Sequence, residues 1–127
     1  MRKLNYLLDT HTLLWATSAP EKLSALVQSV IENERHRLFI SKATLWELSI
    51  KENIGKLSLP RGFFERIFDL GYEPLGIELE HLDSYRALPL IHRDPFDRLL
   101  IAQALSEKLC LLSCNAQIQL YDVEYLW

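Results

Sequence analysis

Residues 94–113, DPFDRLLIAQALSEKLCLLS, contain a helix start, a long helical segment and a buried strand in direct succession. Asp94 and Pro95 are typical of the N-cap and the first position of a helix, which we expect to run to about Lys108. Residues 110–113 are an apolar run of the length of a strand. A helix followed at once by a short apolar strand is the repeating unit of α/β proteins.

The same alternation continues outward from this stretch. Apolar strands are predicted at 4–8, 38–40, 73–77 and 123–126, with Pro74 suited to an edge strand. Helices are predicted at 13–15, 23–34, 42–53, 63–71 and 82–87, with Ser41 as an N-cap and Gly55 as a stop. The pattern predicts a three-layer α/β/α sandwich with a central, mostly parallel sheet. The 127 residues are enough for a single domain, 1–127.

Composition narrows the range of functions. No stretch is long and apolar enough to cross a membrane, and the two cysteines fit no disulfide framework or zinc pattern, so we expect a cytoplasmic protein. The four histidines show no ligand spacing. A net charge of −3 argues against nonspecific nucleic-acid binding, although a local basic patch remains open. Its candidates are Lys42, Lys51, Lys56, Arg61, Arg93 and Arg98.

Two polar residues come directly after predicted strands. Asp9 follows strand 4–8, and Asn115 follows strand 110–113. Ligands of parallel α/β sheets bind beyond the carboxyl ends of the strands, so both side chains are expected on that rim. Taken alone, each residue is more typical of a helix cap, and the sequence leaves both roles open.

Three further acids have two interpretations each. Glu47 borders an apolar stripe formed by Ala43, Trp46, Ile50 and Ile54. Its side chain either faces a cleft walled by that stripe or forms a surface ion pair with Lys51. Trp46 is expected in the core, or in a partner groove if it is exposed.

Asp94 and Asp97 together suit a helix start. Asp97 also shares a face with the apolar Ile101 and Ala104, where a half-buried charge needs a partner. We therefore favour capping for Asp94 and a site role for Asp97.

Several carboxylates at one rim indicate a particular chemistry. Converging acids repel one another and raise their own pKa values, and a hard divalent cation relieves this repulsion. Mg²⁺ and Mn²⁺ prefer oxygen ligands, and they support phosphoryl chemistry by acidifying a bound water. Acids without histidine or cysteine ligands therefore favour Mg²⁺ or Mn²⁺ over zinc.

Four segments carry a family resemblance: LLDTHTLLW at 7–15, ISKATLWELSIKENIGKL at 40–57, LPLIHRDPFDRLLIAQAL at 88–105 and LLSCNAQIQLY at 111–121. The chain resembles PIN-domain proteins, specifically VapC-like toxins of toxin–antitoxin systems. The resemblance implies a metal-dependent endoribonuclease with an RNA substrate, a homodimer and a small antitoxin that covers the active site. It implies catalytic roles for Asp9, Glu47 and Asp97, metal binding by Asp9 and Asp97, and an accessory role for Asp94.

One position departs from the family pattern. An aspartate usual after the fourth strand is replaced by Asn115, which keeps an oxygen able to bind metal or water but removes a negative charge. The alternative function is therefore a weak or inactive PIN scaffold that binds antitoxin or RNA. A phosphotransferase of the haloacid-dehalogenase type, suggested by Asp9-Thr10-His11, is disfavoured because it needs a second aspartate in place of His11.

Overall fold

Within the described residues, the sheet has five parallel strands in the order β3-β2-β1-β4-β5. The sequence predicted the mostly parallel sheet but not this strand order. The structure is a computed structural model that describes residues 4–127. The strands are β1 (Asn5–Leu8), β2 (Arg37–Ser41), β3 (Glu73–Leu75), β4 (Cys110–Leu112) and β5 (Tyr125–Leu126). The order reverses between β1 and β4, so the switch point lies beside the central strand.

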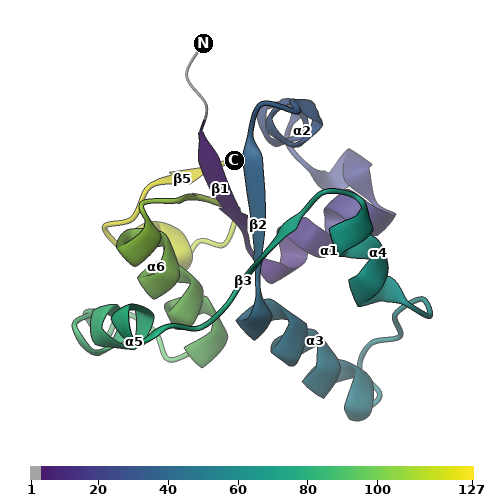
Figure 1. The fold of residues 1–127 in the computed structure, drawn as a ribbon. Coiled ribbons are helices and arrows are strands. Elements are labelled where there is room, and N and C mark those ends of the chain that lie inside the picture. Colours follow the sequence, from purple (N-terminus) through teal and green to yellow (C-terminus); the bar gives the residue numbers. More distant parts are fainter. Residues whose placement is uncertain (1–3) are drawn as a thin grey trace.

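Helices cover both faces of this sheet (Figure 1). The α-helices are α1 (Thr10–Ser18), α2 (Ala25–Glu32), α3 (Lys42–Asn53), α4 (Phe63–Asp69), α5 (Leu79–Arg86) and α6 (Pro95–Glu107). Residues 4–127 also form two 3₁₀ turns, η1 (Pro20–Lys22) and η2 (Ile118–Leu120). In Figure 1, α1, α2 and α4 lie on one side of the strands, and α5 and α6 lie on the other. The predicted three-layer α/β/α architecture is therefore confirmed.

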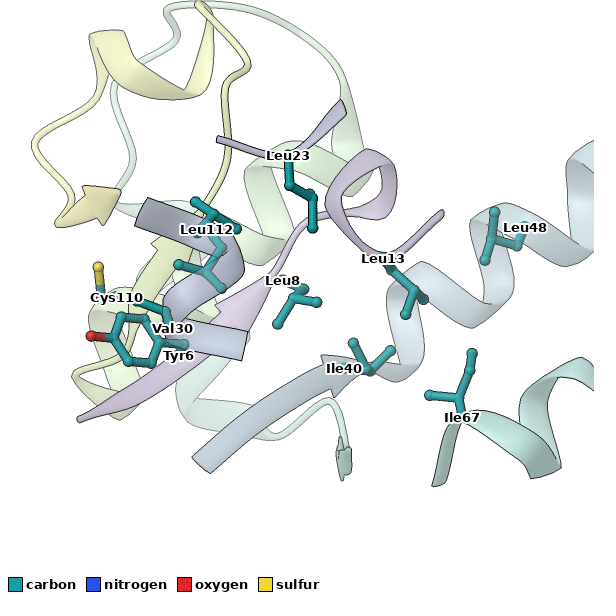
Figure 2. Packing of buried hydrophobic residues seen from close by; sticks show 11 residues of the cluster. Tyr6, Leu8, Leu13, Leu23, Val30, Ile40, Leu48, Ile67, Cys110 and Leu112 are labelled. Carbon is teal, nitrogen blue, oxygen red and sulfur yellow. The ribbon is translucent and has the colours of Figure 1, made fainter. Parts of the chain in front are cut away.

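Each face of the sheet has its own apolar core, because successive side chains of a strand point to opposite faces. Leu8 and Ile40 pack with Leu13 of α1 on the first face, and Figure 2 shows this cluster. Leu7 packs with Ile101 of α6 on the second face. Leu7 and Leu8 are both 0% exposed, so β1 is buried on both sides as the central strand of a parallel sheet.

The predicted helix boundaries follow from local capping. Ser41 accepts a hydrogen bond from Ala43 N–H at the start of α3, and Asp94 accepts from Phe96 and Asp97 N–H at the start of α6. Beyond the end of α3, Gly55 has a φ of +78°, a left-handed conformation that glycine adopts without strain. Among the helices in the described part of the chain, none has the length and apolarity that a membrane span requires.

The expectation that Trp46 of α3 lies in the core is wrong. Trp46 and Ile54 are 60% and 57% exposed, and the buried residues of the helix are Ala43, Thr44 and Leu48. The helix carries two apolar columns, and the one that contains Leu48 packs against the sheet. Trp46 instead meets Phe96 of α6 edge to face, with ring centroids 5.3 Å apart.

Candidate functional site

Asp9 combines the two roles that the sequence left open. It follows β1 and caps α1, where its Oδ1 accepts a hydrogen bond from Thr12 N–H at 2.9 Å. Its own N–H donates to Leu112 O of β4 at 3.3 Å, and the Thr12 hydroxyl donates to the same carbonyl at 2.8 Å. These bonds fix Asp9 at the carboxyl ends of β1 and β4, beside the switch point. The residue is 4% exposed.

Glu47 of α3 is tied to the residue after Asp9. Its Oε1 accepts a hydrogen bond from the Thr10 hydroxyl at 2.6 Å, and its Oε2 lies 3.2 Å from Lys51 Nζ. The ion pair with Lys51 is thus present, as one interpretation predicted. The Glu47 side chain is only 12% exposed, however, and it leans from α3 toward the start of α1.

Asp97 lies in the first turn of α6, capped by Asp94 as predicted. Its Oδ2 accepts hydrogen bonds from Asn115 Nδ2 and His92 Nε2, both at 3.2 Å. Burial raises the pKa of Asp97, the negative charges of Asp94 and Asp9 raise it further, and the His92 contact opposes the shift. The ionised form of Asp97 is therefore disfavoured, and a bound cation would stabilise it.

Asn115 presents its amide nitrogen, not its oxygen, to Asp97. The orientation is fixed because Oδ1 accepts a hydrogen bond from Gln117 N–H at 2.9 Å. The oxygen that was expected to face a metal or water is used in this turn, and the residue acts as a donor to Asp97.

Taken together, the structure gathers the predicted residues in two groups. Asp97, Asp94 and Asn115 form one group, and Glu47 is linked through Thr10 to Asp9. The two groups adjoin at the rim, because Asp9 N–H donates to Leu112 O at the end of β4 and Asn115, three residues further on, donates to Asp97 Oδ2. In keeping with this, burial and the charge of Asp9 raise the pKa of Cys114. Within residues 4–127, no three carboxylate, histidine or cysteine side chains stand close enough together to form a ready metal-binding group.

Three residues at this site were not predicted. His92 contacts Asp97, and Tyr121 contacts His92 through a hydrogen bond of 2.8 Å to Nδ1. Arg98 was named only as a candidate for a surface basic patch, but it is buried: it is 6% exposed and donates to Tyr121 Oη and Pro89 O, each at 2.9 Å. The one sequence signal for His92 is its position two residues before the Asp94 cap.

A parallel α/β sheet with Asp9 at the carboxyl end of its central strand, and with Asp97 held beside the end of β4 by Asn115, defines a class of α/β domain with carboxylates at its switch point. Within that class, the family model of the PIN domain matches residues 6–124, and the chain belongs to this family. Comparison with curated protein sequences gives no significant match.

Solved structures support the same fold. VapBC2 from Rickettsia felis, bound to a DNA fragment from its promoter, is similar with a TM-score of 0.74 and 17% identity, over 97% of this chain and 98% of that chain. DNA-bound VapBC from Salmonella typhimurium gives a TM-score of 0.70 at 18% identity, and VapBC-1 from nontypeable Haemophilus influenzae gives 0.64 at 20%. Both of these cover 97% of each chain.

Proposed function

We propose that the protein is a divalent-metal-dependent endoribonuclease that hydrolyses RNA phosphodiester bonds and serves as the toxin of a toxin–antitoxin pair. One observation carries the proposal: Asp9 and Asp97, 88 residues apart in sequence, both lie at the end of β4, where Asp9 N–H donates to Leu112 O and Asn115, three residues further on, donates to the Asp97 carboxylate. Membership of the PIN family, whose members are in general nucleases, supports it.

The donor set fits Mg²⁺ or Mn²⁺ held by few protein ligands. Such ions take one or two direct carboxylates and keep several waters, so the lack of a third converging acid among residues 4–127 does not conflict with binding. Asp9 and Asp97 would hold the ion. When bound, the ion supplies a water of lowered pKa and offsets negative charge at the reacting phosphate.

The remaining residues have distinct proposed roles. Glu47, fixed by the Thr10 hydroxyl, would orient the attacking water and accept its proton. Asp94 and Asn115 are accessory: Asp94 adds negative charge beside Asp97, and Asn115 holds the Asp97 carboxylate by its amide N–H. Exposed basic residues would steer the RNA backbone; the candidates are Lys42, Lys56, Arg61 and Arg93.

The test is RNA cleavage with Mn²⁺ or Mg²⁺ by wild type and by Asp9→Asn. Asparagine is as good an N-cap as aspartate, so this variant keeps the start of α1 while it loses the charge. Asp122→Asn, at an exposed position, is the matched control. We expect cleavage by wild type and the control but not by Asp9→Asn; equal cleavage by all three proteins would end the proposal.

An antitoxin partner is supported by the VapBC composition of the similar structures and by an apolar groove of about 290 Å³. The groove runs between α1, the 57–60 segment and α4, and Leu14, Leu59 and Phe63 line it. Copurification with the product of the neighbouring open reading frame tests this. Ser58→Arg, at the exposed lip of the groove, should abolish copurification, whereas Ser29→Arg on α2 should not.

A homodimer is supported by the exposed column on α3. Trp46, Ile50 and Ile54 present apolar surface on one helix face, where a second copy would bury it. Light scattering should give a dimer for wild type and a monomer for Trp46→Glu. The cytosol remains the expected compartment, in keeping with two cysteines that are not joined to each other.

A weak or inactive scaffold is the second candidate. It is favoured by Asn115, which stands where the family usually has an acid, and by the lack of a three-acid group in the described chain. Asn115→Asp separates the two functions. A large gain in cleavage would favour the scaffold, and little change would favour an active wild-type enzyme.

A further inference from the structure

A chain of hydrogen bonds leads from the interior of the protein to Asp97. Arg98 Nη1 donates to Tyr121 Oη at 2.9 Å, Tyr121 Oη lies 2.8 Å from His92 Nδ1, and His92 Nε2 lies 3.2 Å from Asp97 Oδ2. The members come from the 88–93 loop, from α6 and from the residue after η2. None of these residues belongs to a strand of the sheet.

The direction of each hydrogen bond follows from counting donors and acceptors. Tyr121 Oη accepts from Arg98 Nη1–H and also from His92 N–H, at 3.2 Å. These two bonds use both lone pairs of the phenol oxygen, so its own proton is free only to point at His92 Nδ1. Nδ1 is therefore an acceptor, and the neutral imidazole carries its proton on Nε2, from which it donates to Asp97 Oδ2.

The ring of His92 is held firmly in this orientation. Tyr121 packs against it edge to face, with ring centroids 5.4 Å apart, and Tyr121 is itself 5% exposed. Arg98 is anchored in turn by Pro89 O and by the ring of Tyr85, whose centroid lies 5.1 Å from its guanidinium carbon. His92 thus has no freedom to turn its ring without breaking several contacts.

Asp97 receives both of its side-chain hydrogen bonds on one oxygen. His92 Nε2 and Asn115 Nδ2 converge on Oδ2, and within residues 4–127 no hydrogen bond is made to Oδ1. Two N–H groups on one carboxylate oxygen fix the plane of the carboxylate and leave the other oxygen for a further ligand. Carboxylates that bind metals are commonly oriented in this way by residues that do not touch the ion.

We propose that His92, held by Tyr121 and Arg98, is a positioning residue that orients the Asp97 carboxylate so that Oδ1 is presented to the divalent cation. This inference rests on the proposed function, since it assigns His92 a role toward the same site. Loss of such supporting contacts typically weakens metal affinity roughly 10- to 100-fold.

The first test needs no metal. Long-range ¹H–¹⁵N NMR spectra of the imidazoles at pH 8 report which ring nitrogen carries the proton. We expect the Nε2–H tautomer for His92 in wild type and a mixture of tautomers in Tyr121→Phe, which lacks the hydroxyl that donates to Nδ1. An Nδ1–H tautomer in wild type would overturn the inference, whatever the protein's activity.

The second test is Mn²⁺ affinity, from the electron paramagnetic resonance signal of the free ion. We expect His92→Ala and Tyr121→Phe to bind Mn²⁺ at least about tenfold more weakly than wild type. His92→Gln should recover much of the affinity, because its amide nitrogen reaches about as far as Nε2. His36→Gln is the control: His36 contacts Val30 O, far from Asp97 in the sequence, and should change stability without changing affinity.

The outcomes separate the two proposals. If wild type binds Mn²⁺ and Asp97→Asn does not, but His92→Ala and Tyr121→Phe bind as wild type does, the positioning role is wrong and the nuclease proposal stands. If wild type binds no Mn²⁺ at all, both are overturned. Should Tyr121→Phe unfold, His92→Ala compared with His92→Gln still decides the question.

Discussion

Replacing Asn115 with aspartate restores the family's usual acid and turns a favourable contact into a repulsive one. The Asn115 amide nitrogen donates to Asp97 Oδ2 at 3.2 Å, and its oxygen accepts from Gln117 N–H. An aspartate keeps the second bond but replaces the donor with a carboxylate oxygen. Without metal, two like charges then face each other beside the additional negative charges of Asp94 and Asp9.

The size of the effect can be bounded. Losing a hydrogen bond to a charged group costs about 1.5–3 kcal/mol, and two unit charges 4 Å apart repel by about 4 kcal/mol at an effective dielectric constant of about 20. The sum is an upper limit, because the Asp97 side chain keeps 18% exposure and the carboxylates move apart or share a proton. We expect the metal-free variant to lose about 2–3 kcal/mol of unfolding free energy at pH 8.

The pH dependence has a definite sign. In the folded variant, repulsion between the carboxylates at positions 97 and 115 raises their pKa values. The folded variant therefore binds more protons than the unfolded chain above the ordinary carboxyl pKa of about 4. Stability then falls as the pH rises through the raised values and recovers on acidification. The deficit of Asn115→Asp should therefore be smaller at pH 5 than at pH 8.

Urea unfolding at both pH values, with and without Mn²⁺, measures these effects. Saturating Mn²⁺ should remove most of the deficit, since a ligand that binds only the folded state stabilises it. Asn33→Asp is the matched control. Like Asn115, the Asn33 side chain accepts a hydrogen bond from the backbone N–H two residues later, here that of Arg35. The assigned contact between Asn115 and Asp97 would be refuted if Asn115→Asp had the unfolding free energy of wild type at pH 8. It would also be refuted if Mn²⁺ stabilised the variant no more than it stabilises wild type.

Three further predictions concern the core and the rim. Leu8→Ala should lower the unfolding free energy by about 2–5 kcal/mol in urea, because Leu8 is 0% exposed at the centre of the sheet; a smaller loss would contradict this packing. Thr10→Val should lower the unfolding free energy in urea by about 1–2 kcal/mol and reduce RNA cleavage, because it removes the hydroxyl that fixes Glu47. Unchanged cleavage would argue against a role for that hydrogen bond. Metal-free wild type should lose stability as the pH rises above the ordinary carboxyl range and Asp97, whose pKa is raised, ionises. The urea midpoints of Asp97→Asn should lack that decline, and parallel pH profiles for the two proteins would contradict this prediction.

Local chemistry made much of the fold predictable. Strand, helix and cap signals are read from neighbouring residues, and the N-caps Ser41 and Asp94 and the left-handed Gly55 are where those signals placed them. The rim position of Asp9 followed from the general rule for parallel sheets. These features depend on few residues at a time, so a single sequence contains them.

Features that depend on distant contacts were not predictable in the same way. Helical spacing identified an apolar column on α3 that includes Trp46, but it could not tell which column faces the sheet, and the column of Leu48 does. The contact of His92 with Tyr121 joins residues 29 apart in sequence, and the buried state of Arg98 depends on the loop that folds over it. No periodicity encodes such pairings.

The central position of β1 has a consequence for synthesis on the ribosome. β1 pairs with β2 about 30 residues later in the chain, whereas the partner of Tyr6 on β4 is Cys110. During translation, the half of the sheet that carries Asp9 therefore emerges well before the helix that carries Asp97. A growing chain contains both acids only once Asp97, 88 residues beyond Asp9, has been made, so a nuclease built on this pair would remain inert toward nearby RNA until then.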